Sequence, residues 1–108
     1  MSFLEDLNIK GYSIIPNVFD LDYIEILKNK CLTLKKKDIK DNGIEKLLLN
    51  KDYEHLRDLA SLDDLFINII ENDSINDLIN RSLNNKAVIH SYNAIITDPD
   101  VKTDMLGF

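Results

Sequence analysis

Apolar residues recur at helical spacing in four parts of the chain, which predicts four amphipathic helices. Two other stretches are rich in isoleucine, valine and tyrosine, which favour strands. The helical parts follow the N-terminus, residue 20, residue 61 and residue 74, and the strand-like stretches span residues 12–15 and 87–97. The pattern therefore predicts the order helix, strand, helix, loop, two helices, strand.

Capping signals mark where these helices begin. Ser2 and Glu5 have the spacing of a capping box, in which each side chain bonds the other residue's backbone N–H. Gly11 is placed to end this first helix, because glycine adopts the left-handed C-cap conformation without steric cost. Asp20 is expected to cap the second helix. The starts of the two later helices are predicted from the pairs Ser61 with Asp64 and Ser74 with Asp77.

Residues 35–52 have the least regular pattern of the chain. Asp41, Asn42 and Gly43 form a turn signal. The apolar residues that follow suffice for only one or two helical turns. We therefore expect a surface loop or insertion over residues 35–52.

The two strand-like stretches predict an incomplete sheet. Residues 12–15 are followed by Pro16, which cannot donate to a ladder, so we expect a short edge strand there. Residues 87–97 are expected to form a longer strand that ends at Asp98 and Pro99. Two strands do not make a stable sheet alone. We therefore expect residues 1–108 to be a single incomplete domain, and the long strand to pair with another chain or with later sequence.

Charge and cysteine content narrow the classes of function. The 108 residues carry a formal net charge of -6, which argues against a general nucleic-acid binder, because phosphate contacts need clustered Lys and Arg. No apolar stretch approaches the length of a membrane span or of a signal-peptide core, so we expect no membrane association. A single cysteine, Cys31, excludes an internal disulfide and favours a cytoplasmic location.

Candidate catalytic and metal-binding residues do not combine into a motif. A non-haem iron site needs two histidines and a carboxylate, and neither His55 nor His90 is followed two residues later by a carboxylate. We expect His55 to lie at the surface and His90 to be a hydrogen-bonded strand residue. Cys31 lies on the apolar face of a predicted helix and is interpreted as a core residue rather than a nucleophile. No catalytic residue and no metal ligand is predicted.

Two segments, in this order, are similar to a known enzyme family. Residues 11–20 read GYSIIPNVFD, precede a helix, and resemble the Gly-Tyr-hydrophobic-hydrophobic-Pro-x-hydrophobic opening of the phytanoyl-CoA dioxygenase family. Residues 87–100 follow two predicted helices and end at Asp98-Pro99-Asp100. They resemble the strand that the family places just before its metal motif. The resemblance covers nearly the whole chain, with a poor match over residues 35–52.

The resemblance implies an Fe(II)- and 2-oxoglutarate-dependent oxygenase built on a double-stranded β-helix (jelly roll). The expected fold class is α+β, with an N-terminal helical layer and the first strands of that β-helix, truncated before the metal motif. The family's His-x-Asp pair follows the segment that matches residues 101–108, so no iron ligand is assigned here. Tyr92 and Asn93 match the strand that lines the family's cofactor pocket. Asn93 would bond a cosubstrate carboxylate, or else face a neighbouring strand or turn.

The sequence is therefore consistent with two functions. In the first, the chain is the N-terminal part of a C–H hydroxylating oxygenase, inactive by itself, and its partner is the remainder of the same domain. Fe(II) and 2-oxoglutarate are then needed by the full-length protein, and no cofactor is expected for this chain alone. In the alternative, the chain is a complete small interaction module. It dimerises, or docks a partner chain, through its helical faces or its long strand. An independent enzyme with an unrecognised site is a third option, and the substrate is not indicated.

Overall fold

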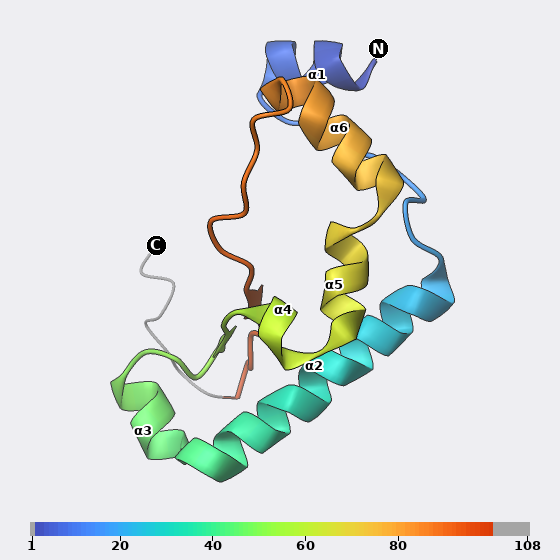
Figure 1. The fold of residues 1–108 in the computed structure, drawn as a ribbon. Helices are drawn as coiled ribbons and strands as arrows, with labels where there is room; N and C mark the ends of the chain where they lie inside the picture. The colour runs from blue at the N-terminus through green and yellow to red at the C-terminus, as the bar shows by residue number, and fades with distance from the viewer. Residues whose placement is uncertain (1, 101–108) are drawn as a thin grey trace.

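The computed structural model describes residues 2–100, and helices dominate this part of the chain. Figure 1 shows the long helix α2 along one side, with α5 and α6 leading away from it toward α1. The elements in chain order are α1 (Phe3–Lys10), α2 (Leu21–Asn42), α3 (Ile44–Leu49), β1 (His55–Leu56), α4 (Leu59–Leu62), α5 (Asp64–Ile70), α6 (Asp73–Leu83) and β2 (Ala94–Ile95).

The chain is less compact than most domains of its length. The radius of gyration of its Cα atoms is 16.6 Å, and the structure extends 46 × 31 × 26 Å. A compact domain of this size has a radius of gyration of about 13 Å. The elements therefore form an open frame, in which much apolar surface stays in contact with solvent.

The first two helices begin where the capping signals predict. The Ser2 hydroxyl accepts a hydrogen bond from the Glu5 N–H at 3.2 Å, and the Glu5 carboxylate accepts one from the Ser2 N–H. Gly11 ends α1 with φ 81°, and its N–H donates to the Leu7 carbonyl. The Asp20 carboxylate caps α2. Both predicted starts are confirmed.

The region expected to be a loop, residues 35–52, is largely helical. Residues 35–42 continue α2 to Asn42, and α3 begins one residue after Gly43. The physical reason is that lysines and acids are tolerated well inside a solvated helix. The Asp41-Asn42-Gly43 signal ends α2 rather than preceding a loop, because Gly43 takes φ 80°.

The two later helices do not begin at the predicted serine caps: α5 begins after Ser61, and α6 begins before Ser74. The N-cap of α5 is Asp63, whose carboxylate accepts from the Leu65 N–H at 2.9 Å. The N-cap of α6 is Asn72, whose side-chain oxygen accepts from the Ile75 N–H at 3.0 Å. Asp and Asn cap a helix as well as Ser does. Ser61 instead lies within the short helix α4, and Ser74 lies in the first turn of α6.

The expected jelly-roll fold is wrong for the described residues. They are mostly helical and contain one two-stranded antiparallel sheet, in which His55 pairs with Ile95 and Leu56 with Ala94. Residues 12–15 are not a strand, and in the segment 87–97 only Ala94–Ile95 is one. A strand needs a ladder partner, and only the short stretch around β1 runs beside this segment.

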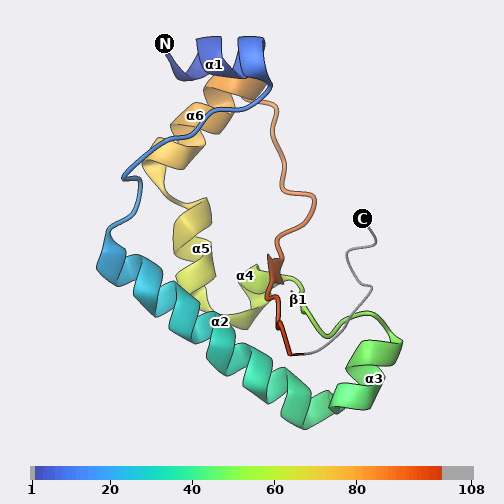
Figure 2. The same ribbon diagram turned by 180° about the vertical axis from the view of Figure 1, so that it is seen from behind.

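The core forms where α2, α4, α5 and the sheet meet, on the same side of α2 in both views (Figures 1 and 2). Leu56, Leu59 and Phe66 are buried at its centre. Tyr92 packs its ring edge-on against Phe66, with 6.4 Å between the ring centroids. Partly buried residues complete the core: Leu27, Cys31, Leu34, Ala94 and Ile96.

Candidate functional site

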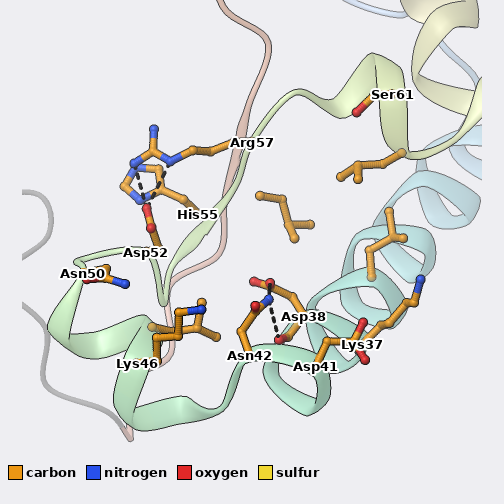
Figure 3. Close-up of a pocket in the computed structure, with 14 residues that line it drawn as sticks. Lys37, Asp38, Asp41, Asn42, Lys46, Asn50, Asp52, His55, Arg57 and Ser61 are labelled. Atoms are coloured by element: carbon orange, nitrogen blue, oxygen red, sulfur yellow. Dashed lines mark hydrogen bonds and ion pairs between the residues drawn. The ribbon is translucent and has the colours of Figure 1, made fainter.

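A polar cleft of about 620 Å³ lies between the last turns of α2, α3 and the segment around β1. Four leucines are among the residues that line it, and the labelled side chains in Figure 3 are polar or charged. Lys37 and Asp41 come from α2, Lys46 from α3, and Asp52 and Arg57 from the segment around β1. The cleft therefore brings charges of both signs together from three parts of the chain.

The buried ammonium of Lys35 holds one wall of this cleft in place. Its Nζ lies 3.0 Å from the Asp38 carboxylate, 3.2 Å from the Asp52 carbonyl oxygen and 3.1 Å from the His55 carbonyl oxygen. It also lies 5.6 Å from the ring centroid of Tyr53, a favourable position for a cation. Lys35 is only 7% exposed. We call this arrangement the Lys35 clamp, because it fastens residues 52–55 to α2.

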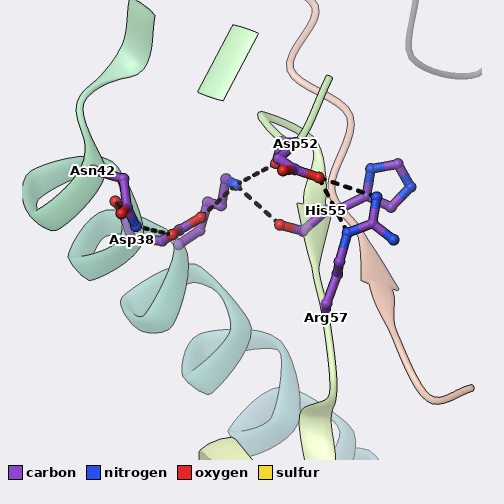
Figure 4. Close-up of polar contacts among 6 residues, drawn as sticks. Asp38, Asn42, Asp52, His55 and Arg57 are labelled. Atoms are coloured by element: carbon purple, nitrogen blue, oxygen red, sulfur yellow. Dashed lines mark hydrogen bonds and ion pairs between the residues drawn. The ribbon is translucent and has the colours of Figure 1, made fainter. Parts of the chain in front are cut away.

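Two carboxylates in the cleft are already engaged. Oδ1 of Asp52 accepts hydrogen bonds from Nε and Nη2 of Arg57, at 3.1 and 3.0 Å (Figure 4). Asp38 accepts from Lys35 and from the Asn42 amide. The contacts around these residues therefore stabilise the walls of the cleft, and they leave Lys37, Lys46 and Asp41 without ion pairs within the part of the chain that the structure describes.

Among the described residues that line the cleft, no nucleophile lies beside a base. The Ser61 hydroxyl donates to the Asp58 carbonyl oxygen at 2.8 Å and not to a histidine. His55 has its Nδ1 buried, with no hydrogen-bond partner among residues 2–100. Within the same residues, no three His, Cys, Asp or Glu side chains are close enough to hold a metal ion together. The arrangement can attract a polar ligand, but it supplies no recognisable catalytic pair.

The two residues predicted to line a cofactor pocket both form hydrogen bonds within the fold. Tyr92 donates its hydroxyl to the Phe66 carbonyl oxygen at 2.8 Å, and burial is the main cause that raises the pKa of its hydroxyl. Asn93 accepts from the Asp58 N–H at 3.1 Å. Both also border a second cleft of about 500 Å³, together with Arg57. Their role toward a cosubstrate stays a prediction.

The other candidates from the sequence lie apart in the fold. His55 is half-buried in β1 rather than at the surface, because pairing with β2 covers it. His90 is exposed in residues 87–97, which we call the extended segment, and its side chain makes no hydrogen bond within the described residues. Cys31 is half-buried and packs against the core, and burial raises the pKa of its thiol. A raised thiol pKa opposes nucleophilic chemistry.

Sequence reasoning missed Tyr53, which ties the end of the extended segment to the fold. Its ring is 6% exposed, and its hydroxyl donates to Oδ2 of Asp98 at 2.9 Å. The hydrogen bond to Asp98, burial and nearby negative charge all raise the pKa of the Tyr53 hydroxyl. The available signal was a tyrosine on the segment that leads into β1, but nothing in the sequence indicated its partner 45 residues away.

Replacing Tyr53 with phenylalanine is expected to lower the free energy of unfolding by about 1.5 kcal/mol, because Asp98 loses its donor. The raised folded-state pKa also sets a pH dependence. The contribution of Tyr53 is fully present below its unfolded pKa of about 10 and is lost as the pH rises through the folded pKa. Urea denaturation at neutral and alkaline pH measures both effects. If the two proteins lose equal stability on alkaline titration, the proposed origin of the shift is wrong.

An apolar groove of about 430 Å³ lies between α1, the segment before α2 and one side of α6. Phe3, Ile15, Phe19 and Leu78 are among the residues that line it. None of the described residues that line the groove has a titratable side chain. It can contact another apolar surface, but it provides no chemistry.

No helix of residues 2–100 is both long enough and apolar enough to cross a membrane. Comparison of the chain with protein-family models, with curated proteins and with solved structures gave no match. The segment 101–108, after which the family's metal motif was expected, lies outside the described residues. The resemblance to the phytanoyl-CoA dioxygenase family therefore stays a prediction from residues 11–20 and 87–100.

Proposed function

We propose that this chain is a non-catalytic scaffold whose extended segment, residues 87–97, receives a strand from another stretch of polypeptide. The observation that carries the proposal is that one edge of this segment is bonded, through residues 92–96, to residues 54–59, while the other edge has no strand partner among residues 2–100. Exposed strand edges are templates for pairing with further polypeptide. A strand added there would extend the two-stranded sheet without disturbing the Lys35 clamp.

The larger context that we propose is a cytoplasmic Fe(II)- and 2-oxoglutarate-dependent oxygenase that resembles the phytanoyl-CoA dioxygenase family. In support, the Gly-Tyr opening lies between the C-cap of α1 and the Asp20-capped start of α2, as an opening before a helix should. Tyr92 and Asn93 border a cleft together with Arg57. In this context the chain contributes a helical layer and one cleft-lining segment, and hydroxylation of an unactivated C–H bond takes place on residues supplied elsewhere.

The reading frame after residue 108 tests the oxygenase context. The proposal expects an in-frame His-x-Asp within a few codons. It also expects the product that carries this motif to convert 2-oxoglutarate to succinate with Fe(II). Residues 1–108 alone should bind Fe(II) no more tightly than an unrelated acidic protein of similar size. Stoichiometric iron binding with 2-oxoglutarate turnover by residues 1–108 would contradict the scaffold role.

The second candidate is a small interaction module that uses the same edge to dock a separate chain. The observation that favours it is the exposure of apolar side chains on the extended segment: Val88 is 90% exposed and Ile89 59%. Such side chains are expected to be covered in the functional state. A stop codon directly after residue 108 would favour this candidate and contradict the oxygenase context.

A further inference from the structure

We infer that the edge of the extended segment pairs with the same segment of a second copy of this chain, antiparallel, about a two-fold axis at Tyr92. This inference rests on the proposed docking function and names its partner. Three observations support it. The backbone N–H and C=O groups of odd-numbered residues face the uncovered edge, and this edge lacks charged residues and proline. In one antiparallel register, the apolar and charged positions of the two copies also face each other.

Between Tyr92 and Ile96, the even-numbered residues direct their backbone groups to residues 54–59. The Ile96 N–H donates to the Glu54 carbonyl oxygen at 2.7 Å, and the Leu59 N–H donates to the Tyr92 carbonyl oxygen at 2.8 Å. In an antiparallel ladder, successive residues direct their N–H and C=O groups to opposite edges. The odd-numbered residues, such as Asn93 and Ile95, therefore direct their backbone groups to the edge that no strand covers within residues 2–100.

This edge lacks the features that protect strand edges from pairing. Natural edges carry charges, prolines or bulges that prevent association. Residues 87–97 contain no Lys, Arg, Asp, Glu or Pro. Ile89 is 59% exposed and Ile95 is 53% exposed. The edge is therefore an uncharged, β-prone template.

One register satisfies the backbone groups of both copies. With the two-fold axis at Tyr92, Ser91 lies opposite Asn93 of the second copy and Ile89 lies opposite Ile95 of the second copy. All four are odd-numbered, so their N–H and C=O groups face each other and can exchange hydrogen bonds. The two-stranded sheet then becomes a continuous sheet of four strands, and three or more strands are needed for independent stability.

The same register matches side chains. Tyr92, Ala94 and Ile96 are half-buried and pack on the core, while the odd-numbered residues between them are exposed. Val88 has the same parity as the buried set but is 90% exposed, and the register places it beside Ile96 of the second copy. Cross-strand neighbours on one face stabilise a sheet in this way.

The ends of the paired segments are complementary in charge. Lys86 precedes the uncharged stretch and Asp98 follows it. With the axis at Tyr92, Lys86 lies opposite Asp98 of the second copy, and symmetry forms this pair twice. Moving the axis one residue in either direction places Lys86 opposite Ile96, or Val88 opposite Asp98. The register at Tyr92 is thus the one that aligns both the apolar and the charged positions.

Sedimentation equilibrium over a range of protein concentrations, with two proline variants, tests the inference. Ile89→Pro removes an N–H that faces the second copy, and His90→Pro removes one that faces away from it. We expect a concentration-dependent dimer whose dissociation constant rises at least about tenfold in Ile89→Pro, because symmetry removes two hydrogen bonds. His90→Pro should leave it nearly unchanged. Thermal unfolding of each variant checks that the monomer fold is retained.

A charge reversal provides a second test. Lys86→Asp should weaken the dimer, because it places a carboxylate opposite Asp98 of the second copy, and raising the salt concentration should reduce this loss. A monomer at all concentrations, or equal effects of the two prolines, would overturn the inference.

Amide hydrogen exchange distinguishes the absence of self-pairing from the absence of any strand pairing at this edge. If the chain is monomeric but the odd-numbered amides of residues 87–97 are protected in the longer product of the reading frame, only self-pairing is overturned. If they stay unprotected there as well, both proposals are overturned.

Discussion

Replacing Phe66 with alanine is expected to lower the free energy of unfolding by about 4 kcal/mol. Phe66 is 2% exposed and is the largest fully buried side chain among the described residues. It packs with Leu56 and Leu59, and its ring contacts Tyr92 edge-on. Because small domains are stable by only about 5–15 kcal/mol, this variant should be close to unfolding at room temperature. Urea denaturation followed by far-UV circular dichroism measures the loss.

The matched control for this prediction is Ile14→Ala. Ile14 is 80% exposed in the segment before α2, so its truncation should change the stability by no more than about 0.5 kcal/mol. If both variants lose the same stability, the core does not lie around Phe66. A large loss in Ile14→Ala alone would place an apolar contact on the N-terminal segment that the structure lacks.

Replacing Lys35 with methionine is expected to cost about 3 kcal/mol of stability. Methionine keeps much of the side-chain volume but removes the three donors of the clamp. The carbonyl oxygens of Asp52 and His55 would lose their partner, and the Asp38 carboxylate its cation. Unpaired polar groups in a partly buried site are costly. The segment 52–55 should therefore loosen from α2, and faster amide exchange there measures this directly.

Lys36→Met is the control, because Lys36 is the exposed neighbour on the same helix. It should leave both the stability and the exchange of residues 52–55 nearly unchanged. A Lys35→Met variant as stable as the unmodified chain would mean that desolvation of the ammonium cancels the benefit of its contacts. In that case the clamp would not be what holds the cleft wall.

The helical part of the fold was largely predictable, because its signals are local. The caps at Ser2 and Asp20 and the stop at Gly11 depend on residues within a few positions of each other, and the structure places all three as expected. The error at residues 35–52 has a local cause as well. A turn signal such as Asp41-Asn42-Gly43 indicates only that a helix ends near it, and it does not indicate a loop on both sides.

The sheet could not be predicted in the same way, because a strand depends on its partner. Residues 87–97 have the composition of a long strand, but only Ala94–Ile95 has a neighbour in the described residues. The composition of residues 87–97 therefore favours a longer strand than the one that forms within the described residues. The family resemblance extended this preference to a jelly roll, and the largely helical fold contradicts that extension.

The Lys35 clamp behind the cleft wall could not be predicted, because a lysine within a basic run is typical of a solvated helix surface. Lys35 belongs to the basic run 35–37, and α2 continues beyond this run to Asn42. A signal was present, since Lys35 lies four residues after Cys31 and one after Leu34, on the side of α2 that carries core residues. Its partners on the segment before β1 could not be known without the tertiary fold.

Residues 92–96 bond the extended segment to residues 54–59 along one edge, and no strand covers the other edge among residues 2–100. Residue-resolved amide hydrogen exchange on the dilute monomer tests this arrangement most directly. We expect slow exchange at the even-numbered Ala94 and Ile96, whose N–H groups face the segment around β1, and fast exchange at the odd-numbered Asn93 and Ile95. Equal protection at all four amides would mean that a further strand covers the edge. Fast exchange at all four would mean that the sheet is not formed, and either result contradicts the account.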